Sequence, residues 1–260
     1  IMPSLVGSEM CIRDRNILSY IQFDHSSGCA FPPFHARFLV DRYTPKDHES
    51  IVFDPCAGWG GRLIGTLLVN RPHHVQYIGV DPEERNRFAY EGLTRRATIY
   101  LKKELKGSRD ATVHYMPFED FIQSKDAKSL YGKVDFAMTS PPYFGAENYN
   151  PKNKNQSANR YAEYQVIWRE RFYRVLMKGV YDLLKKGGHF ALNIADVAEA
   201  EELERDARVL GKEAGFVTGG FYKLAMSLSP SAIKSGKARH IVRVNGVPFK
   251  YEPVFVFRKP

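Results

Sequence analysis

Cysteine is scarce in this chain, and no apolar run is long enough to cross a bilayer. The 260 residues contain three cysteines, Cys11, Cys29 and Cys56, and none belongs to a C-x-x-C pair. Neither a disulfide framework nor a zinc ribbon is indicated, which favours a reducing, cytoplasmic setting. His25, Cys29 and His35 lie close in sequence but have no apparent fourth ligand, so we expect no metal. A membrane helix needs about 20 apolar residues, and we expect no membrane partner.

Acidic residues are outnumbered by basic ones. The chain has 38 Lys and Arg against 29 Asp and Glu, which gives a formal net charge of +9. Such an excess favours a polyanionic partner, with nucleic acid first, although a basic protein without such a partner is the plainer alternative. A hydrophobic content of 43% over this length suits one large α/β domain, and the sequence has no internal repeat.

The first fifteen residues do not resemble a secretory signal, because Gly7, Ser8 and Glu9 interrupt their apolar content. They resemble a translation of sequencing-adapter DNA. We therefore expect residues 1–15 to be a non-native segment and residues 16–260 to form a single domain. An ordinary N-terminal arm is the alternative.

The clearest local pattern is a strand, a glycine-rich turn and a helix. The apolar run at residues 51–53 predicts a buried strand, and a helix is expected from residue 63 to about residue 70. Between them, Gly58 and Gly60 let the backbone approach a ligand closely, as in the opening of a doubly wound nucleotide-binding sheet. The spacing fits neither G-x-G-x-x-G nor a P-loop. Asp54 at the strand end suits a cationic ligand better than a pyrophosphate, and a tight turn without a ligand is the alternative.

Acidic residues also follow the next two expected strands. Asp81-Pro82 ends an apolar run, and Asp81 lies 23 residues after Gly58, a spacing that suits a carboxylate for ribose hydroxyls. After the third strand, Phe118 could pack on an adenine ring while Glu119 or its neighbour Asp120 accepts the amino group. The alternative is that Phe118 belongs to the core and the acids begin a turn.

A fourth apolar strand, residues 134–138, runs into Ser140-Pro141-Pro142-Tyr143. The Ser140 hydroxyl can accept a hydrogen bond, and the two prolines present carbonyls without competing N–H groups. Tyr143 offers a face on which a planar base can stack. These features suit a flat ring that carries an exocyclic amine, and a proline-stiffened turn with an aromatic plug is the alternative.

The run from Asp54 to Gly60, then Asp81, then the run from Ser140 to Tyr143 resemble the S-adenosylmethionine-dependent DNA methyltransferases that modify cytosine N4 or adenine N6. The similarity extends from about residue 31 to residue 259. It implies a catalytic group of Ser140, Pro141, Pro142 and Tyr143. It also implies that S-adenosylmethionine is bound by Phe31, Pro32, Asp54, Cys56, Gly58, Trp59, Gly60, Asp81, Pro82, Phe118 and Glu119. The family usually has Phe in place of Cys56 and Ser or Thr in place of Trp59.

The resemblance also implies a fold and a reaction. The expected fold is α/β and Rossmann-like, with a mostly parallel, doubly wound sheet and an antiparallel C-terminal strand or hairpin. The expected reaction is methyl transfer to a flipped DNA base by in-line displacement, in a bacterial, archaeal or phage-infected cell, as in restriction–modification. Serine before the two prolines favours cytosine N4. The alternatives are adenine N6, an RNA or protein-glutamine methyltransferase, and a non-catalytic DNA-binding protein.

Two basic segments are expected to contact DNA. One is a polar loop at residues 145–160, for which an ordinary flexible loop is the alternative. The other is a hairpin at residues 232–250, where Asn245-Gly246 separates two β-rich runs. A basic ribbon can lie along a groove, although charge also protects an edge strand from aggregation. The candidate DNA contacts are Lys152, Lys154, Arg160, Lys237, Arg239 and Arg243. A homodimer is left open.

Overall fold

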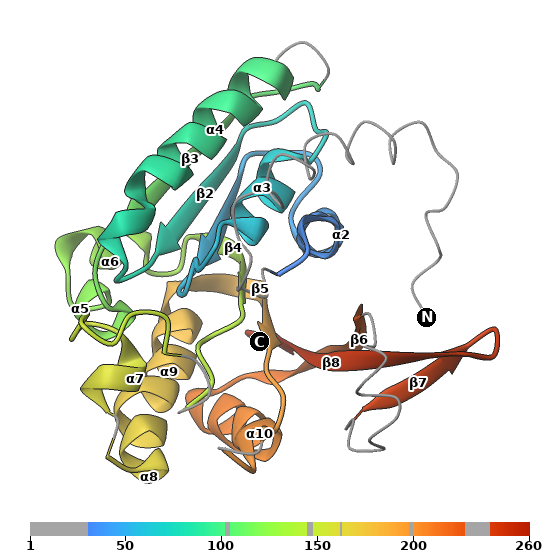
Figure 1. The fold of residues 1–260 in the computed structure, drawn as a ribbon. Coiled ribbons are helices and arrows are strands. Elements are labelled where there is room, and N and C mark those ends of the chain that lie inside the picture. The colour runs from blue at the N-terminus through green and yellow to red at the C-terminus, as the bar shows by residue number, and fades with distance from the viewer. Residues whose placement is uncertain (1–30, 102–104, 145–147, 162, 198–199, 227–239) are drawn as a thin grey trace. The chain divides into compact units, whose positions relative to one another are not determined.

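A mixed sheet organises the part of the chain that the computed structural model describes (Figure 1). That part comprises residues 31–101, 105–144, 148–161, 163–197, 200–226 and 240–260. The expected non-native segment and the candidate DNA contacts Lys237 and Arg239 lie outside these residues. The unit Phe31–Pro260 is therefore described by itself.

The eight strands of the sheet follow a doubly wound order. Their spatial order is β3-β2-β1-β4-β5-β8-β6, and β7 pairs with β8. All pairings among β1 to β5 are parallel, whereas β8 runs antiparallel to β5, β6 and β7. This arrangement confirms the predicted sheet. The strands are β1 (Ser50–Asp54), β2 (Val75–Val80), β3 (Arg109–His114), β4 (Val134–Thr139), β5 (Leu184–Asn193), β6 (Val217–Met226), β7 (Ile241–Val244) and β8 (Val247–Arg258).

Helices connect the parallel strands and cover the sheet (Figure 1). Helix α3 contacts both α2 and α4, and α9 contacts α5, α6 and α10. A 3-10 turn (Glu84–Asn86) precedes α4, and a π-helical turn (Arg169–Tyr173) joins α8 to α9. The α-helices are α2 (Pro33–Tyr43), α3 (Gly61–Leu67), α4 (Arg87–Leu101), α5 (Phe118–Phe121), α6 (Lys125–Leu130), α7 (Ser157–Arg160), α8 (Gln165–Trp168), α9 (Arg174–Leu183) and α10 (Leu203–Ala214).

The central strands are apolar on both faces. Every residue of β4 is buried, as expected for a parallel strand that has helices on each side. Phe53 of β1 joins the core cluster that contains α9, whereas its neighbour Val52 is equally buried but lies outside that cluster. Because successive side chains of a strand point to opposite faces, these two residues are buried on opposite faces of the sheet.

Close packing between α2 and α3 fixes the C-terminal side of the glycine turn, where α3 begins. A Cβ on Gly61 would overlap the carbonyl oxygen of Phe31, and one on Gly65 would lie 2.5 Å from the carbonyl oxygen of Pro33. Glycine is therefore required at both positions. The contact holds Phe31 and the start of α2 against α3.

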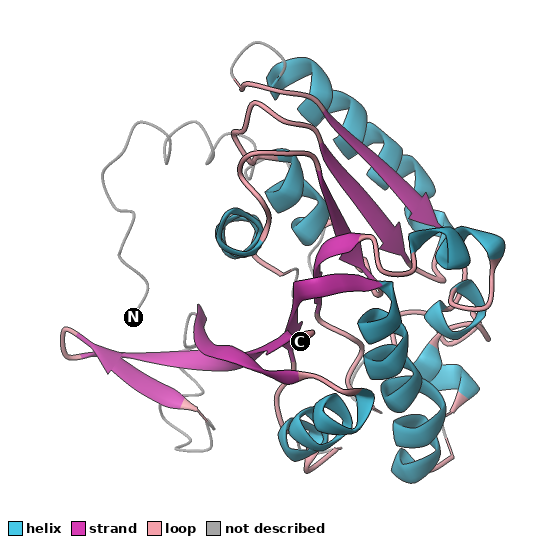
Figure 2. Cartoon of the chain, turned by 180° about the vertical axis from the view of Figure 1, so that it is seen from behind, coloured by secondary structure: helices cyan, strands magenta, loops and turns pink. Residues whose placement is uncertain are grey.

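The C-terminal strands extend the sheet beyond β5, as both views show (Figures 1 and 2). β8 pairs with β5 through residues 254–258 and with β7 through residues 247–250. The turn between β7 and β8 is Asn245-Gly246, and both residues have positive φ, 49° and 80°, as a tight hairpin of this kind requires. The predicted Asn-Gly hairpin is confirmed for its described residues.

No described helix combines the length and the apolar character of a membrane span. Within the same residues, no group of three His, Cys, Asp or Glu side chains is placed to hold a metal ion.

Candidate active site

The glycine corner (residues 54–61) and the serine–proline corner (residues 140–143) lie at neighbouring strand ends. β1 pairs in parallel with β4, with Val52 opposite Phe136 and Phe53 opposite Ala137. Both strands therefore end at the same edge of the sheet. The chain continues from β1 towards β2 on one side and reaches β4 on the other, so this edge is the topological switch point where open α/β sheets bind ligands.

Asp54 ties the two corners together. Its carboxylate is fully buried and accepts a 3.0 Å hydrogen bond from the Thr139 hydroxyl. Thr139 directly precedes Ser140 in the chain. The same group accepts from Arg62 Nε at 2.7 Å, the Tyr77 hydroxyl at 2.8 Å and the Cys56 amide at 3.3 Å. Both oxygens are therefore occupied by donors of the chain itself. The cation paired with Asp54 in this structure is Arg62. The sequence pattern predicted a cationic ligand beside Asp54 and did not predict a cation from the chain itself.

Arg62 is the buried partner that sequence reasoning missed. Desolvation, the largest single effect, lowers the pKa of its guanidinium, but the Asp54 carboxylate together with Tyr77 and Cys56 raises it by more, so the pKa is raised overall. The guanidinium also donates to the Cys56 carbonyl and lies 5.5 Å from the centre of the Phe31 ring. Nothing in the sequence pattern distinguished Arg62 from an exposed helix residue.

Asp81 links β2 to the glycine corner. It is 8% exposed, and its carboxylate accepts from the Gly58 amide at 2.7 Å and the Glu83 amide at 2.8 Å. Burial raises the pKa of Asp81 to about 6, and the two backbone N–H groups oppose that rise. A carboxylate has about four acceptor sites, so two donors leave capacity for the hydroxyls of a ligand.

The glycine corner needs left-handed backbone at two positions. Gly58 has φ 59° and Gly60 has φ 81°, a region that residues with a Cβ rarely adopt. The Gly58 carbonyl accepts from the Tyr90 hydroxyl and from Asn86 Nδ2. Trp59, between the glycines, is half-buried.

The predicted N-terminal segment lies at this corner. Phe31 is 8% exposed, and the Gly61 contact described above places its carbonyl beside the start of α3. Pro32 is the N-cap residue of α2. Burial strongly raises the pKa of the nearby Cys56 thiol. The structure therefore brings Phe31, Pro32 and Cys56 together with the glycines.

The serine–proline corner divides into accessible and buried residues. Ser140 and Pro142 are half-buried, and Pro141 is buried. Tyr143 is 7% exposed and belongs to the core cluster with Trp168. In this conformation its ring plugs the corner, which is the alternative role considered from the sequence.

Phe118 belongs to the core cluster, and its contact with an adenine ring stays a prediction. It is 2% exposed, its ring lies 6.2 Å from that of Phe53, and it packs against Gly179 of α9. Glu119 accepts a 2.8 Å hydrogen bond from the Tyr161 hydroxyl. Burial raises the pKa of Glu119.

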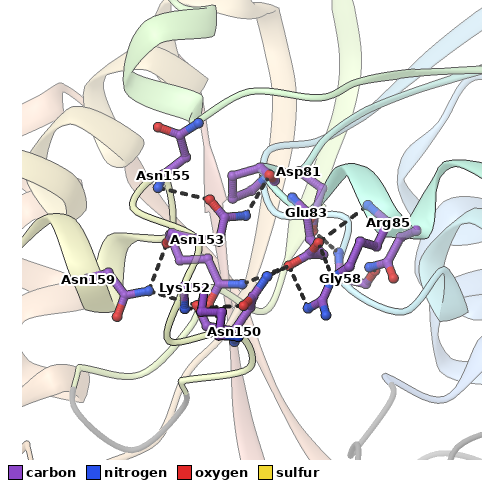
Figure 3. A network of polar contacts seen from close by, with 12 residues as sticks. Gly58, Asp81, Glu83, Arg85, Asn150, Lys152, Asn153, Asn155 and Asn159 are labelled. Carbon is purple, nitrogen blue, oxygen red and sulfur yellow. Dashed lines mark hydrogen bonds and ion pairs between the residues drawn. The ribbon is translucent and has the colours of Figure 1, made fainter.

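Glu83 is a second residue that sequence reasoning missed. It lies two residues after Asp81, and its side chain is 12% exposed. Its carboxylate accepts from Arg85 Nε at 2.7 Å and from Asn150 Nδ2 at 2.7 Å (Figure 3). No local pattern in the sequence could have indicated it, because its partner Asn150 lies 67 positions away.

The candidate DNA contacts are spread over two regions. Lys152 and Lys154 are exposed, but Arg160 donates to both carboxylate oxygens of Asp120, at 3.1 and 3.2 Å. The charge of Arg160 is therefore met within the chain. Arg243 lies on the exposed β7 strand and donates to the Gly246 carbonyl at 3.1 Å. In both views the β7–β8 hairpin lies well apart from α7 (Figures 1 and 2).

Comparison with known proteins bears on the fold. Neither a protein-family model nor a curated protein matches the chain. The tRNA (m1A58) methyltransferase of Aquifex aeolicus aligns with a TM-score of 0.50 and 10% identity, over 94% of this chain and 76% of that one. At this identity the likeness shows the fold alone.

Two further solved structures are less similar in shape. A methyltransferase from Pyrococcus furiosus has a TM-score of 0.47 at 14% identity, over 95% of this chain and 98% of that one. A SAM-dependent methyltransferase from Methanosarcina mazei has a TM-score of 0.46 at 13% identity, over 85% of this chain and 96% of that one.

Proposed function

We propose that residues 31–260 form the catalytic domain of an S-adenosylmethionine-dependent methyltransferase that acts on the exocyclic amine of a DNA base, with cytosine N4 as the preferred target. The observation that carries this proposal is the hydrogen bond between Thr139 and Asp54. It holds the glycine corner beside the serine–proline corner, which supports a site where a cofactor at the first corner would lie next to acceptors for amine hydrogens at the second.

The residues at the glycine corner fit such a cofactor. Asp81 has acceptor capacity for ribose hydroxyls, and the left-handed Gly58 and Gly60 give a turn without Cβ atoms. Trp59 and Phe31 would flank the ligand, while Asp54 would act from behind by holding the turn. When bound, S-adenosylmethionine supplies an electrophilic methyl group on a sulfonium.

The serine–proline corner would orient the acceptor. The Ser140 hydroxyl and the Pro141 carbonyl would accept the amine hydrogens and turn the nitrogen lone pair towards the glycine corner. Such alignment supplies much of the acceleration in reactions of this kind. Flipping a paired base costs a few kcal/mol, and stacking on Tyr143 would return about 1–3 kcal/mol once that ring has left its core position.

Adenine N6 is the second candidate, because the two acceptors contact only the amine and leave the ring unspecified. Ser140 before the prolines favours cytosine by resemblance. The basic residues of the β7–β8 hairpin fit either nucleic acid, and DNA is preferred to RNA on that same resemblance. A planar amide of a protein glutamine would meet the same acceptors.

Mass spectrometry of nucleosides separates these targets. DNA and RNA would be incubated with the protein and S-adenosylmethionine, then digested. We expect N4-methylcytosine from DNA, none from the Ser140→Ala variant, and a wild-type yield from Ser129→Ala, which removes an exposed hydroxyl on α6. N6-methyladenine would reassign the base. A protein that binds the cofactor but methylates neither nucleic acid would reject a base as substrate.

A further inference from the structure

The loop after the serine–proline corner crosses the carboxyl edge of the sheet. We call its described residues, 148–161, the strap. The strap follows β4 in the chain, yet it contacts the residues that follow β2. Because β1 lies between β2 and β4, the strap passes over the end of β1, where the glycine corner is.

Three side-chain hydrogen bonds fasten the strap beyond β2 (Figure 3). Asn150 Nδ2 donates to Glu83 Oε2 at 2.7 Å, and Gln156 Nε2 donates to the same oxygen at 3.4 Å. Asn153 Nδ2 donates to the Pro82 carbonyl at 2.9 Å. Two of the three attachments therefore converge on one carboxylate.

The strap also contacts the glycine corner itself. The rings of Trp59 and Tyr149 meet edge to face, with centroids 5.8 Å apart and planes at 87°. Trp59 stands in the family's Ser or Thr position, so this contact uses a residue at which the chain departs from the pattern. The strap thus contacts the glycine turn at Trp59, between Gly58 and Gly60.

The strap is held in shape by its own amides. Asn159 Nδ2 donates to the carbonyls of Asn150 at 2.9 Å and Asn153 at 2.7 Å, and Gln156 Oε1 accepts from the Asn150 amide at 3.3 Å. These amides are occupied within the strap, whereas Lys152 and Lys154, the DNA contacts predicted for this loop, are exposed. Because these hydrogen bonds connect its two ends, the strap would move away from the glycine corner as one rigid segment.

Glu83 suits the role of anchor because its charge is stabilised from two sides. Arg85 donates through its amide, Nε and second terminal nitrogen, at 3.3, 2.7 and 3.0 Å, while the strap amides approach the carboxylate as well. Those bonds, with that of Arg85 first, lower the pKa of Glu83 to about 2. The anchor is therefore an anion throughout the neutral range.

We propose that Glu83 is a positioning residue for the cofactor: it fastens the strap over the glycine corner, so that the cofactor is enclosed and strap release limits its exchange. This inference rests on the proposed function for the identity of the ligand. It assigns Glu83 no contact with the reacting atoms.

The test is the dissociation rate of S-adenosylhomocysteine, the demethylated product, from pre-loaded protein. Glu83→Ala removes the acceptor of the Asn150–Glu83 hydrogen bond, and Asn150→Ala removes its donor. Each should release the ligand about tenfold faster, within the range expected for a hydrogen bond to a charged group. The double variant should be no faster than the faster single variant, because both remove the same link. Asn155→Ala is the control, since Asn155 joins the strap through its backbone N–H and its side chain points away from Glu83 in Figure 3.

A single-turnover measurement separates anchoring from general damage to the fold. With protein saturated in S-adenosylmethionine, the methyl-transfer rate of the Asn155→Ala control should equal that of wild type, and the rates of Glu83→Ala and Asn150→Ala should fall by a smaller factor than their dissociation rates rise. Wild-type dissociation rates in both single variants, or effects that multiply in the double variant, would overturn the inference while leaving the proposed function standing. Wild-type protein that binds neither ligand by calorimetry would overturn both.

Discussion

The Thr139 hydroxyl donates a 3.0 Å hydrogen bond to the carboxylate of Asp54, and this bond joins the ends of two adjacent parallel strands. Thr139 is 1% exposed and Asp54 is fully buried, so the bond lies in the interior. Because Asp54 belongs to the glycine corner and Thr139 directly precedes Ser140, the bond holds the two corners at a fixed separation.

Replacing Thr139 by Val should therefore affect catalysis more than cofactor binding. The variant keeps the shape but leaves one buried acceptor on Asp54 with fewer donors, at a cost of about 1–3 kcal/mol in unfolding free energy. Methyl transfer should fall at least tenfold while the dissociation constant for S-adenosylmethionine changes less than threefold. Thr66→Val is the control, because it removes a buried hydroxyl that donates only to a carbonyl of α3. Equal effects of the two variants on turnover would contradict the role of the bond.

Cofactor affinity should rise with pH in a window set by Asp81. Its pKa is raised to about 6 in the fold from 3.8, so between these values the folded protein binds more protons than the unfolded chain. The free energy of unfolding therefore falls as the pH rises through this window, by roughly 3 kcal/mol in total. Affinity should increase over the same range, because the ionised carboxylate accepts ribose hydroxyls better.

Calorimetric titrations of S-adenosylmethionine between pH 5 and 7.5 measure this effect. Asp81→Asn should bind more weakly than wild type at pH 7.5 and lose most of the pH dependence. A slope that is the same in wild type and in Asp81→Asn would show that another group titrates, and would remove Asp81 from the ribose role.

Packing at the start of α3 gives a prediction about stability. Gly61→Ala would place a methyl group on the Phe31 carbonyl, and overpacking of this kind costs about 1–3 kcal/mol or more. Gly92→Ala in the middle of α4 is the matched control, since a Cβ there meets no atom of the described residues within 4 Å. It should stabilise the protein by up to about 1 kcal/mol. Urea unfolding of the two variants decides, and equal midpoints would contradict the close contact.

The two candidate DNA contacts that the structure describes most fully should behave differently. Arg243→Ala should reduce the salt dependence of DNA binding by about one phosphate contact, whereas Arg160→Ala should leave the slope unchanged because Asp120 already neutralises that charge. Fluorescence anisotropy across a salt series measures both slopes. A loss of slope in Arg160→Ala alone would place the nucleic acid at the strap instead.

The sequence predicted those features of the site that are local in the chain. Asp81 and Ser140 each follow a continuous apolar run, and parallel strands bring the ends of such runs to one edge. The hairpin was predictable from Asn245-Gly246 for the same reason: its geometry depends on two adjacent residues.

Features that depend on distant partners were not predictable. Asn150 and Glu83 are 67 positions apart, and no periodic pattern connects them. Asp54 and Arg62 are close in sequence, but only the pitch of α3 turns the guanidinium back over the strand end. For Phe118 the pattern fitted both a ligand face and the core, and only its burial among Phe53 and α9 distinguishes them.

The account depends most on the division of labour between the two corners, and Ser140→Ala tests it directly. Transfer of a labelled methyl group from S-adenosylmethionine to DNA would be measured beside the dissociation constant for the cofactor, on the same preparations. We predict a loss of transfer of roughly 100-fold, with the dissociation constant within about twofold of wild type. Unchanged transfer, or a cofactor affinity that falls together with transfer, would contradict the assignment of the amine to the serine–proline corner.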